Sequence, residues 1–482
     1  MITITSVNQE GKASERLYDN RRVAFFTPEG QRVPVPLKKM PPPMSDQGTG
    51  TGNAQCNCAQ DSSERSSPTP VMTDEKKKKY FTRIRSDSKS PDVRLLKIQM
   101  GLACNYRCSY CKQAIHVSGA QTSSSADVDH FVATFDDWCT APTEDEIVIQ
   151  LWGGEPLIYF NKMQKLVKFL RSRFEKARIS TLSNGSLVNE AIVDFLIEND
   201  VVLAISHDGP GQKTTRKEDP LAEGSESLKW IRNYVERSKN PLYVNMVLSK
   251  QNHDAKAGVD YIKSILGQSV QAGYEGIVQV EDEAQFDESS MFSDEDYEAL
   301  RHQFTDAIRA GQTHNISPFN RKFDELLRCW ASTSDMAMVF DNTFQKCGMD
   351  DAYTLAVNLK GDALVCHSVN TKIGHVSEFK GIKLSDGGVE HWSTKEECRN
   401  CPVLSMCRGS CMNQHGSAWY YTCNNEFHFN LAIFEAAFEL AFAEKIIHLG
   451  GDFVRPQNPR VIGIADGAGT GTGRPGMTPC AT

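Results

Sequence analysis

The chain has 482 residues, and at about 150 residues per domain this length corresponds to roughly three domains or one large domain with appendages. Its content of 40% hydrophobic, 24% charged and 9% aromatic residues is typical of a globular protein and excludes a collagen-like or wholly disordered chain. A net charge of −8, no apolar run near the ~20 residues of a membrane helix and no secretory signal profile predict a cytoplasmic protein without a nucleic acid or membrane partner.

Residues 1–90 are expected to be mostly flexible. They mix Ser, Thr, Pro, Gly and charged residues, and such a segment buries too little apolar area to offset its ordering entropy. Residues 22–34 are the exception, since VAFFTPEGQRV fits a small hairpin around Pro28, Glu29 and Gly30.

Residues 91–320 alternate between short apolar strands and amphipathic helical stretches. Strands are predicted at 93–100, 147–152, 179–182, 201–206, 242–248 and 276–280. Helices are predicted at 127–138, around 163–170, and at 190–198, 225–237, 259–266 and 294–310. This α/β alternation predicts a parallel sheet, open or curled into a partial (β/α)6 barrel, which binds ligands at the carboxyl ends of its strands.

The pattern changes in the last third of the chain. Residues 321–426 are predicted to form a small domain held by metal, because from Cys347 to Cys423 they are rich in Cys, Gly and Asn with little periodic order. A strongly apolar helix is predicted at 427–449, and the Gly, Thr and Pro repeats of residues 450–482 predict a flexible tail.

Fifteen cysteines in a chain expected in the cytosol favour metal binding or catalysis over disulfides. Cys104, Cys108 and Cys111 lie in GLACNYRCSYCKQ, directly after the first strand of the alternating region. Three thiolates on one loop can converge on one metal centre, and they favour zinc or an iron–sulfur cluster. Structural zinc normally has four ligands, and His116 is the best fourth ligand for that alternative.

The segment resembles the radical S-adenosylmethionine (radical SAM) superfamily, whose motif has three cysteines at these intervals and an aromatic residue, here Tyr110, before the last. The resemblance implies a 4Fe-4S cluster with three cysteine ligands and one iron open to SAM. It also implies reductive cleavage of SAM to a 5′-deoxyadenosyl radical, which abstracts a substrate hydrogen. The electron is expected from a donor such as flavodoxin or ferredoxin.

Three further segments, WGGEP, LSNG and ISHDGP, match the family in order, and each ends a predicted strand. By this resemblance the SAM-binding residues are Gly153, Gly154, Glu155, Asn184, Ser206 and Arg216. Glu155 is expected at the amino group, because a carboxylate suits an ammonium. Ser206 and Arg216 are expected at the SAM carboxylate, although Arg216 is equally compatible with a solvated loop charge.

Seven cysteines and Gly361 match the intervals of the SPASM domain, which carries auxiliary iron–sulfur clusters in radical SAM peptide-modifying enzymes. The resemblance implies that one auxiliary cluster is held by Cys398, Cys401, Cys407 and Cys423, and the other by Cys347, Cys366 and Cys411. The second set is one ligand short, because sulfatase maturases have a further cysteine where this chain has Tyr353. Either Cys329 supplies it, or one iron is open, which we favour. Two zinc sites are the alternative.

Auxiliary clusters suit a net two-electron oxidation, because a nearby cluster can accept the electron left after hydrogen abstraction. Sulfatase maturases, which oxidise Cys or Ser to formylglycine, carry an aspartate base after the cysteine equivalent to Cys366, and this chain has His367 there. Histidine can also accept a proton near neutral pH, but this replacement, together with Tyr353, counts against formylglycine formation. We therefore expect a maturase that forms a thioether or carbon–carbon cross-link in a ribosomally made peptide or protein. Formylglycine formation and a non-catalytic iron–sulfur or zinc scaffold are the alternatives.

Overall fold

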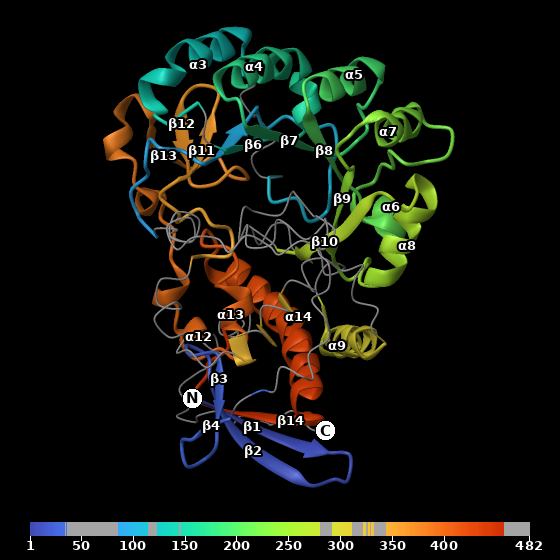
Figure 1. Cartoon of the computed structure of the whole chain (residues 1–482), viewed down its shortest axis with the longest axis vertical. Coiled ribbons are helices and arrows are strands. Elements are labelled where there is room, and N and C mark those ends of the chain that lie inside the picture. Colours follow the sequence, from blue (N-terminus) through green and yellow to red (C-terminus); the bar gives the residue numbers. More distant parts are fainter. Residues whose placement is uncertain are drawn as a thin grey trace, which may run out of the picture.

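The computed structural model describes residues 1–33, 35, 85–113, 123–143, 146–279, 292–310, 322–323, 326–327, 329–331 and 344–456. A large sheet with helices on its outer face forms the upper part of the molecule in Figure 1, and a smaller sheet forms the lower end. Residues 396–407 of the Cys-rich segment and a long helix at residues 416–442 lie between the two sheets (Figure 1).

The large sheet contains the predicted parallel strands. They are β5 (Leu95–Gln99), β6 (Ile147–Trp152), β7 (Ala177–Ser183), β8 (Val201–Ser206), β9 (Tyr243–Leu248) and β10 (Gln271–Ile277). The predicted α/β fold with a partial barrel is confirmed, because the six strands pair in parallel in the order in which they follow one another. The sixth strand begins at Gln271 rather than at residue 276, since its pairing with β9 starts opposite Tyr243.

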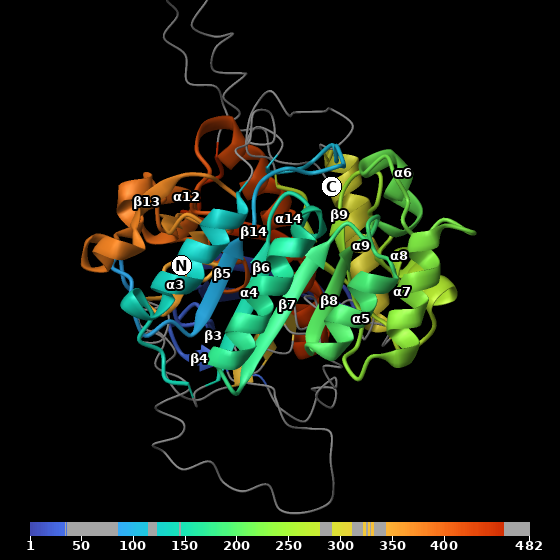
Figure 2. The same ribbon diagram turned by 90° about the horizontal axis from the view of Figure 1, so that it is seen from above.

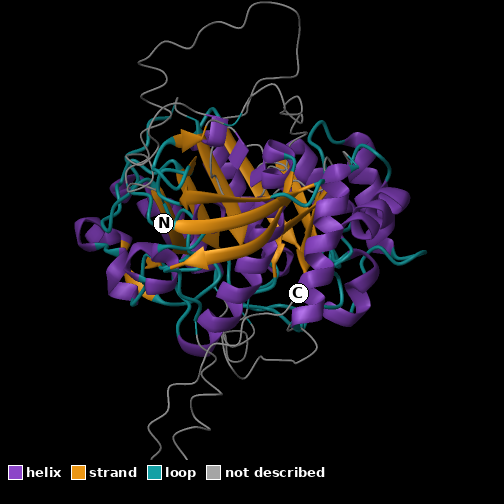
Figure 3. Ribbon diagram, turned by 90° about the horizontal axis from the view of Figure 1, so that it is seen from below, coloured by secondary structure: helices purple, strands orange, loops and turns teal. Residues whose placement is uncertain are grey.

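Helices connect these strands and cover the outer face of the sheet (Figures 1 and 2). They are α3 (Ser125–Trp138), α4 (Phe160–Arg173), α5 (Glu190–Glu198), α6 (Gln212–Thr215), α7 (Glu226–Arg237) and α8 (Ala255–Leu266), with the short 3-10 helices η2 (Pro156–Tyr159) and η3 (Gly209–Gly211). Side chains of Ser124, Asn189, Ser225 and Asp254 accept backbone N–H bonds at the starts of four of them. Figure 3 shows the helices distributed around the strands.

The Cys-rich segment continues the same sheet across the predicted boundary at residue 320. Its strands are β11 (Thr354–Asn358), β12 (Asp362–Leu364) and β13 (Lys372–His375). Strand β11 pairs in parallel with β5, because buried Leu355 and Val357 complete the apolar core beside that strand. Gly361 (φ +85°) makes the turn to β12, and a Cβ there would lie 2.8 Å from His375 Nε2.

The rest of the Cys-rich segment has little regular structure, as predicted. Its short helices are η7 (Val376–Gly381), η8 (Leu384–Gly387), η9 (Trp392–Thr394), α12 (Glu396–Arg399) and α13 (Leu404–Cys407).

A five-stranded antiparallel sheet includes residues 2–33, which belong to the segment predicted to be mostly flexible. Its strands are β14 (Glu444–Gly451), β1 (Ile2–Asn8), β2 (Ala13–Asp19), β3 (Ala24–Phe26) and β4 (Arg32–Val33), in that spatial order. Strands β3 and β4 form the hairpin predicted for residues 22–34. The sheet is stable because β1 buries Ile2 and Ile4 on one face and pairs with β14 from the other end of the chain. Residues 36–84 lie outside the described residues.

The apolar helix α14 (Gly416–Phe442) begins and ends earlier than the predicted 427–449. The helix stops where Ala443 adopts a left-handed conformation (φ 57°). The residues that follow, up to Gly451, pair with β1, so the predicted tail does not begin at residue 450. Helix α14 packs against α9 (Asp294–Arg309) and β14. No helix in the described residues combines the length and apolar character needed to cross a membrane.

Phe25 is the centre of the contact between the small sheet and α14. Its ring lies 4.8 Å from that of Trp330 and 5.0 Å from that of Phe442. Phe25→Ala should lower the free energy of unfolding by about 3–5 kcal/mol, because it leaves a cavity in this cluster. Half-buried Phe453→Ala is the control and should cost less. Denaturant unfolding checks both variants, and equal effects would contradict the packing described here.

Candidate functional site

The carboxyl ends of the parallel strands meet at one cavity of about 420 Å³. From the barrel, the predicted site residues that line it are Cys104, Cys108, Cys111, Gly153, Gly154, Asn184, Ser206 and Arg216. From the Cys-rich segment, they are Cys347, Cys366, His367 and Cys411. Two cysteine sets that are far apart in the sequence therefore face the same space.

The first cysteine set lies on the loop that leaves β5. The backbone N–H of Tyr106 donates to Cys104 Sγ at 3.4 Å. Burial raises the pKa of the Cys108 thiol to about 11, while the Arg216 charge acts in the opposite direction. These thiols therefore need bound metal to be held as thiolates near neutral pH, because a coordinated thiol loses its proton.

Gly153 and Gly154 hold the cysteine loop against the end of β6. The N–H of Gly154 donates to the Gly101 carbonyl at 2.9 Å. A Cβ on Gly153 would lie 2.5 Å from the Gly101 carbonyl oxygen, and one on Gly154 would lie 2.4 Å from that of Leu102. The paired glycines are thus needed for contact between two backbones, in addition to lining the cavity.

Glu155 lies behind the cavity wall. Its carboxylate is 0% exposed and accepts hydrogen bonds from Ser183 Oγ at 2.8 Å, from the Asn184 N–H at 2.7 Å and from the Leu157 N–H at 3.0 Å. Burial raises its pKa to about 7, and these three donors oppose the increase. Glu155 thus joins the turns after β6 and β7, and its contact with the amino group of SAM stays a prediction.

Asn184 and Ser206 lie on the cavity wall, at the ends of β7 and β8, as predicted. Asn184 Nδ2 donates to Asn105 Oδ1 at 2.8 Å, and Asn105 Nδ2 donates to Ser186 Oγ at 2.8 Å. Because Asn105 belongs to the cysteine loop, these bonds fix that loop to the turn after β7.

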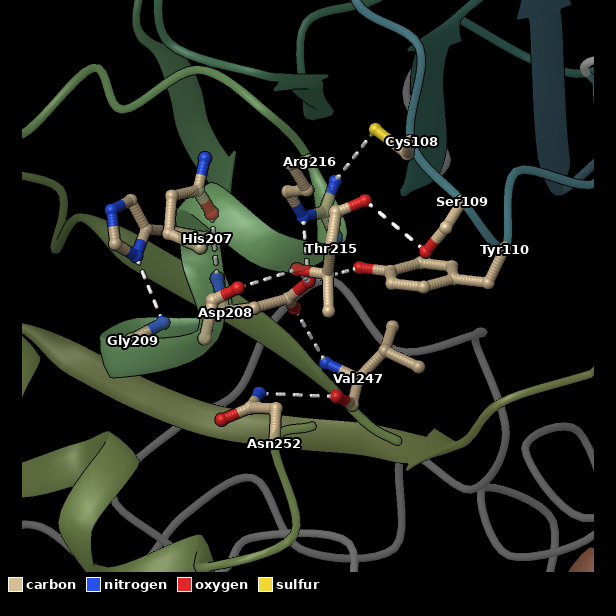
Figure 4. A network of polar contacts seen from close by, with 12 residues as sticks. Cys108, Ser109, Tyr110, His207, Asp208, Gly209, Thr215, Arg216, Val247 and Asn252 are labelled. Atoms are coloured by element: carbon tan, nitrogen blue, oxygen red, sulfur yellow. Dashed lines mark hydrogen bonds and ion pairs between the residues drawn. The ribbon is translucent and has the colours of Figure 1, made fainter. Parts of the chain in front are cut away.

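Arg216 is 8% exposed and lines the cavity, which excludes the solvated loop charge. Its Nε donates to Asp208 Oδ2 at 3.0 Å, and its Nη1 lies 4.0 Å from Cys108 Sγ. Asp208 also accepts hydrogen bonds from the hydroxyls of Tyr110 and, at 2.7 Å, Thr215 (Figure 4). One buried carboxylate thus compensates the guanidinium and ties it to the cysteine loop.

Asp208 has a structural role that the sequence motifs did not predict. The residue is 0% exposed, and its Oδ1 also accepts the backbone N–H of Val247 at 3.1 Å, so it joins the ends of β8 and β9. The sign of this role in the sequence is an aspartate just after a predicted strand, with Arg216 eight residues later. The ring of the neighbouring His207 accepts a hydrogen bond from the Gly209 N–H at 3.0 Å (Figure 4), and its Nε2 lies 3.0 Å from Asp219 Oδ1.

His367 lines the cavity beside Cys366. Its ring packs against Trp152 with 3.9 Å between the centroids. Burial, followed by the charges of Lys97 and Lys112, lowers its pKa well below the usual value, so the imidazole is neutral near pH 7. Its Nδ1 is buried and has no hydrogen-bond partner among the described residues.

The pKa values of two of the remaining cysteines respond to the charges of other cysteines. Burial raises the pKa of Cys347 to about 12, and Cys411 and Cys366 raise it further by their charges. Burial likewise raises the pKa of Cys398, with added contributions from Cys407, Cys423 and Cys401. The backbone N–H of Ser368 donates to Cys366 Sγ at 3.2 Å, as the Tyr106 N–H does to Cys104.

Cys329, one of the two alternatives for completing the Cys347 set, does not line the cavity. Cys329 interacts electrostatically with Tyr18 of β2. The Tyr353 ring lies under the Arg94 guanidinium, 4.3 Å away. His116, the candidate zinc ligand, lies outside the described residues. None of the described cysteines forms a disulfide, and the described residues contain no group of His, Cys, Asp or Glu placed around a single metal ion.

Residues 98–257 match the family model described as Radical SAM superfamily. The chain contains a radical SAM domain. It is 20% identical over 363 residues to the radical SAM cyclopropyl synthase TigE of Paramaledivibacter caminithermalis, an alignment that covers 70% of this chain and 71% of TigE. It is also 31% identical over 108 residues to the uncharacterized protein MJ0907 of Methanocaldococcus jannaschii. That alignment covers 22% of this chain and 35% of MJ0907.

Among solved structures, native anSMEcpe with bound AdoMet and Kp18Cys peptide has a similar fold. The TM-score is 0.50 at 19% identity, and the similarity covers 78% of this chain and 99% of anSMEcpe. The matched radical SAM segment includes the first cysteine loop and all three strand-end turns, whereas the residues from Cys347 onward lie beyond it.

Glu155 variants distinguish a ligand contact from a structural role in the radical SAM domain. Glu155→Gln keeps an acceptor for Ser183 and Leu157, so SAM should bind within about threefold of the wild type. Glu155→Ala leaves three buried donors without a partner and should cost about 1–3 kcal/mol of stability for each. Equilibrium dialysis and thermal unfolding check this. A Gln variant that folds but fails to bind SAM would restore the carboxylate contact predicted from the sequence.

Asp208→Asn tests the network of Figure 4. Removing the charge leaves the buried Arg216 guanidinium without an ionised partner, so the free energy of unfolding should fall by about 3–5 kcal/mol. SAM affinity should fall by at least about tenfold, because Arg216 is no longer held at the cavity. The exposed Asp260→Asn is the control. Wild-type affinity in Asp208→Asn would contradict this role.

Proposed function

We propose that this protein is a radical SAM maturase that introduces an oxidative cross-link, a thioether or a carbon–carbon bond, into a ribosomally made peptide or protein. The observation that carries the proposal is that the Cys104, Cys108 and Cys111 loop and the Cys347, Cys366 and Cys411 set line one cavity. A substrate in that cavity is within reach of both cysteine sets.

The first cysteine set fits a 4Fe-4S cluster. Three soft thiols from one loop face the cavity, and one sulfur accepts a backbone N–H, as sulfurs around such clusters commonly do. Cys104, Cys108 and Cys111 would hold the cluster. When bound, the cluster and SAM would supply a 5′-deoxyadenosyl radical that removes a hydrogen atom from the substrate.

The cavity wall offers complementary groups for SAM. Arg216, oriented by Asp208, is suited to the carboxylate of SAM, because a guanidinium binds a carboxylate through two parallel hydrogen bonds. Ser206 lies at the neighbouring strand end and Asn184 beside the cysteine loop. The backbone of Gly153 and Gly154 supports the cysteine loop and completes this side of the site.

The Cys-rich segment is proposed to be a SPASM domain. Cys398, Cys401, Cys407 and Cys423 would hold one auxiliary cluster, and Cys347, Cys366 and Cys411 the other. Because Cys329 lies beside Tyr18, the second cluster would keep one iron without a cysteine ligand. Such clusters would accept the electron released in a two-electron oxidation, and an external donor such as flavodoxin or ferredoxin would supply the first electron.

His367 is proposed to accept the proton released in this oxidation. The imidazole lies on the cavity wall, and its buried Nδ1 has no partner among the described residues. TigE is named a cyclopropyl synthase, and anSMEcpe has been solved with a peptide bound. The peptide bound to anSMEcpe supports a peptide substrate, and the name of TigE supports the formation of a carbon–carbon bond.

The triple variant Cys104→Ala, Cys108→Ala, Cys111→Ala should form no 5′-deoxyadenosine from SAM under anaerobic reducing conditions. The variant should retain the auxiliary clusters, so its iron content should fall from about twelve to about eight per chain. Chromatography and iron quantitation check both outcomes. Formation of 5′-deoxyadenosine by this variant would contradict the assignment, and a wild-type content of four or fewer irons would remove the auxiliary clusters.

Short peptides encoded beside this gene are the candidate substrates. With SAM and a reductant, the wild-type protein should lower the mass of the substrate by about 2 Da per cross-link, because two hydrogens are removed. Mass spectrometry with fragmentation locates the new bond. A loss of about 2 Da confined to one Ser side chain, or of about 18 Da at one Cys side chain, where oxygen replaces sulfur, would instead indicate formylglycine chemistry.

A further inference from the structure

Glu275 lies at an irregularity in β10, the last parallel strand. Tyr274 pairs with Met246 of β9 and Gly276 pairs with the next residue, Val247, so Glu275 has no opposite residue. An extra residue in one strand is a β-bulge, which changes the direction of a side chain and is frequent next to active sites.

The bulge places Glu275 on the cavity. Its neighbours in the strand, Tyr274 and Gly276, are buried, whereas Glu275 is exposed and lines the cavity. No other Asp or Glu is among the described residues that line this cavity. Because the Glu155 carboxylate is behind the wall, the acidic group that a ligand meets here is Glu275.

The carboxylate of Glu275 accepts a hydrogen bond from a neighbouring strand. Asn245 Nδ2, from β9, donates to Oε1 at 2.9 Å and fixes the orientation of the group. This hydrogen bond engages Oε1, and the side chain lines the cavity. A carboxylate that is oriented in this way and lines the cavity can accept a further hydrogen bond from a bound molecule.

The charges around Glu275 limit the kind of donor. The cavity walls desolvate the Glu275 carboxylate and raise its pKa, and the cations Arg216, Lys97 and Lys346 act in the opposite direction. Lys346 is itself paired with buried Glu426, and Arg216 with Asp208. The charge of Lys97 compensates that of Glu275, so a neutral N–H, O–H or S–H group is the favoured further partner.

We infer that Glu275 is a substrate-positioning residue, which accepts a hydrogen bond from a neutral N–H, O–H or S–H group of the peptide beside the reacting carbon. This inference rests on the proposed maturase function and adds a residue that neither the cysteine motifs nor the strand-end turns contain. Asn245 orients Glu275, and the bulge in β10 brings it to the substrate.

Carboxylate footprinting of the anaerobic holoenzyme tests which molecule covers Glu275. Glu275 should be amidated by a water-soluble carbodiimide and glycine amide in the protein alone and in the presence of SAM. Addition of the peptide that becomes 2 Da lighter should protect it. Protection by SAM alone, or no protection by the peptide, would overturn the inference. Exposed Glu226 should react equally in all samples.

Glu275→Gln provides the second test, with Glu275→Asp as the charge-retaining variant and Glu226→Gln as the matched surface control. In Glu275→Gln the KM for the peptide should rise by at least about tenfold, the effect of losing one charge-assisted hydrogen bond, while SAM affinity changes by less than about twofold. Glu275→Asp should recover part of the loss. An unchanged KM, or weakened SAM binding, would contradict the inference.

The proposed function and this inference fail in different ways. If the wild type modifies no peptide, the maturase proposal fails, and the variants of Glu275 are not needed to show it. If the wild type modifies the peptide and Glu275→Gln does so with the same KM, only the inference about Glu275 fails.

Discussion

The contact between two stretches of backbone, residues 101–103 and Gly153–Gly154, is the constraint on which the site depends. A Cβ at either glycine would lie within 2.5 Å of a carbonyl oxygen of the cysteine loop, so neither position accepts a side chain without moving that loop. The contact fixes where three thiols stand relative to the strand ends. Glu155, Asn105 and Asp208 then extend the same arrangement to β7, β8 and β9 through hydrogen bonds.

A second group of buried polar contacts joins the barrel to the Cys-rich segment. Gln279 accepts a hydrogen bond from Lys112 of the cysteine loop and donates to Ser410 and Glu426, and Lys346 completes the group through its ion pair with Glu426. The Lys346 charge lowers the pKa of Glu426 to about 2 despite burial, so this carboxylate stays ionised. Breaking a buried pair of this kind is costly, which keeps the two cysteine sets at one cavity.

The parts predicted well from the sequence are those with local signals. Apolar runs located the strands, and the spacing of Cys104, Cys108 and Cys111 with the strand-end turns indicated the radical SAM domain. The parts predicted badly depend on partners far away in the chain. Strand β1 shows the alternation ITITSVN, yet it is stable only beside β14, more than 400 residues later, and that same segment reads locally as the end of an apolar helix.

The two glutamates show the same limit within the site. Glu155 stands in a motif that predicted a ligand contact, and the structure adds that it is buried and accepts hydrogen bonds from three protein donors. Glu275 stands in no motif, and it reaches the cavity only because the pairing of β10 with β9 shifts by one residue. Neither register nor burial can be obtained from residue types alone, so the wall of the cavity required the structure.

The most direct measurement of the central claim is electron paramagnetic resonance of the reduced, anaerobically prepared protein before and after addition of SAM. The account predicts the signal of a reduced 4Fe-4S cluster that depends on Cys104, Cys108 and Cys111 and changes when SAM binds. A signal that SAM leaves unaltered, or zinc in place of iron at these cysteines, would contradict it.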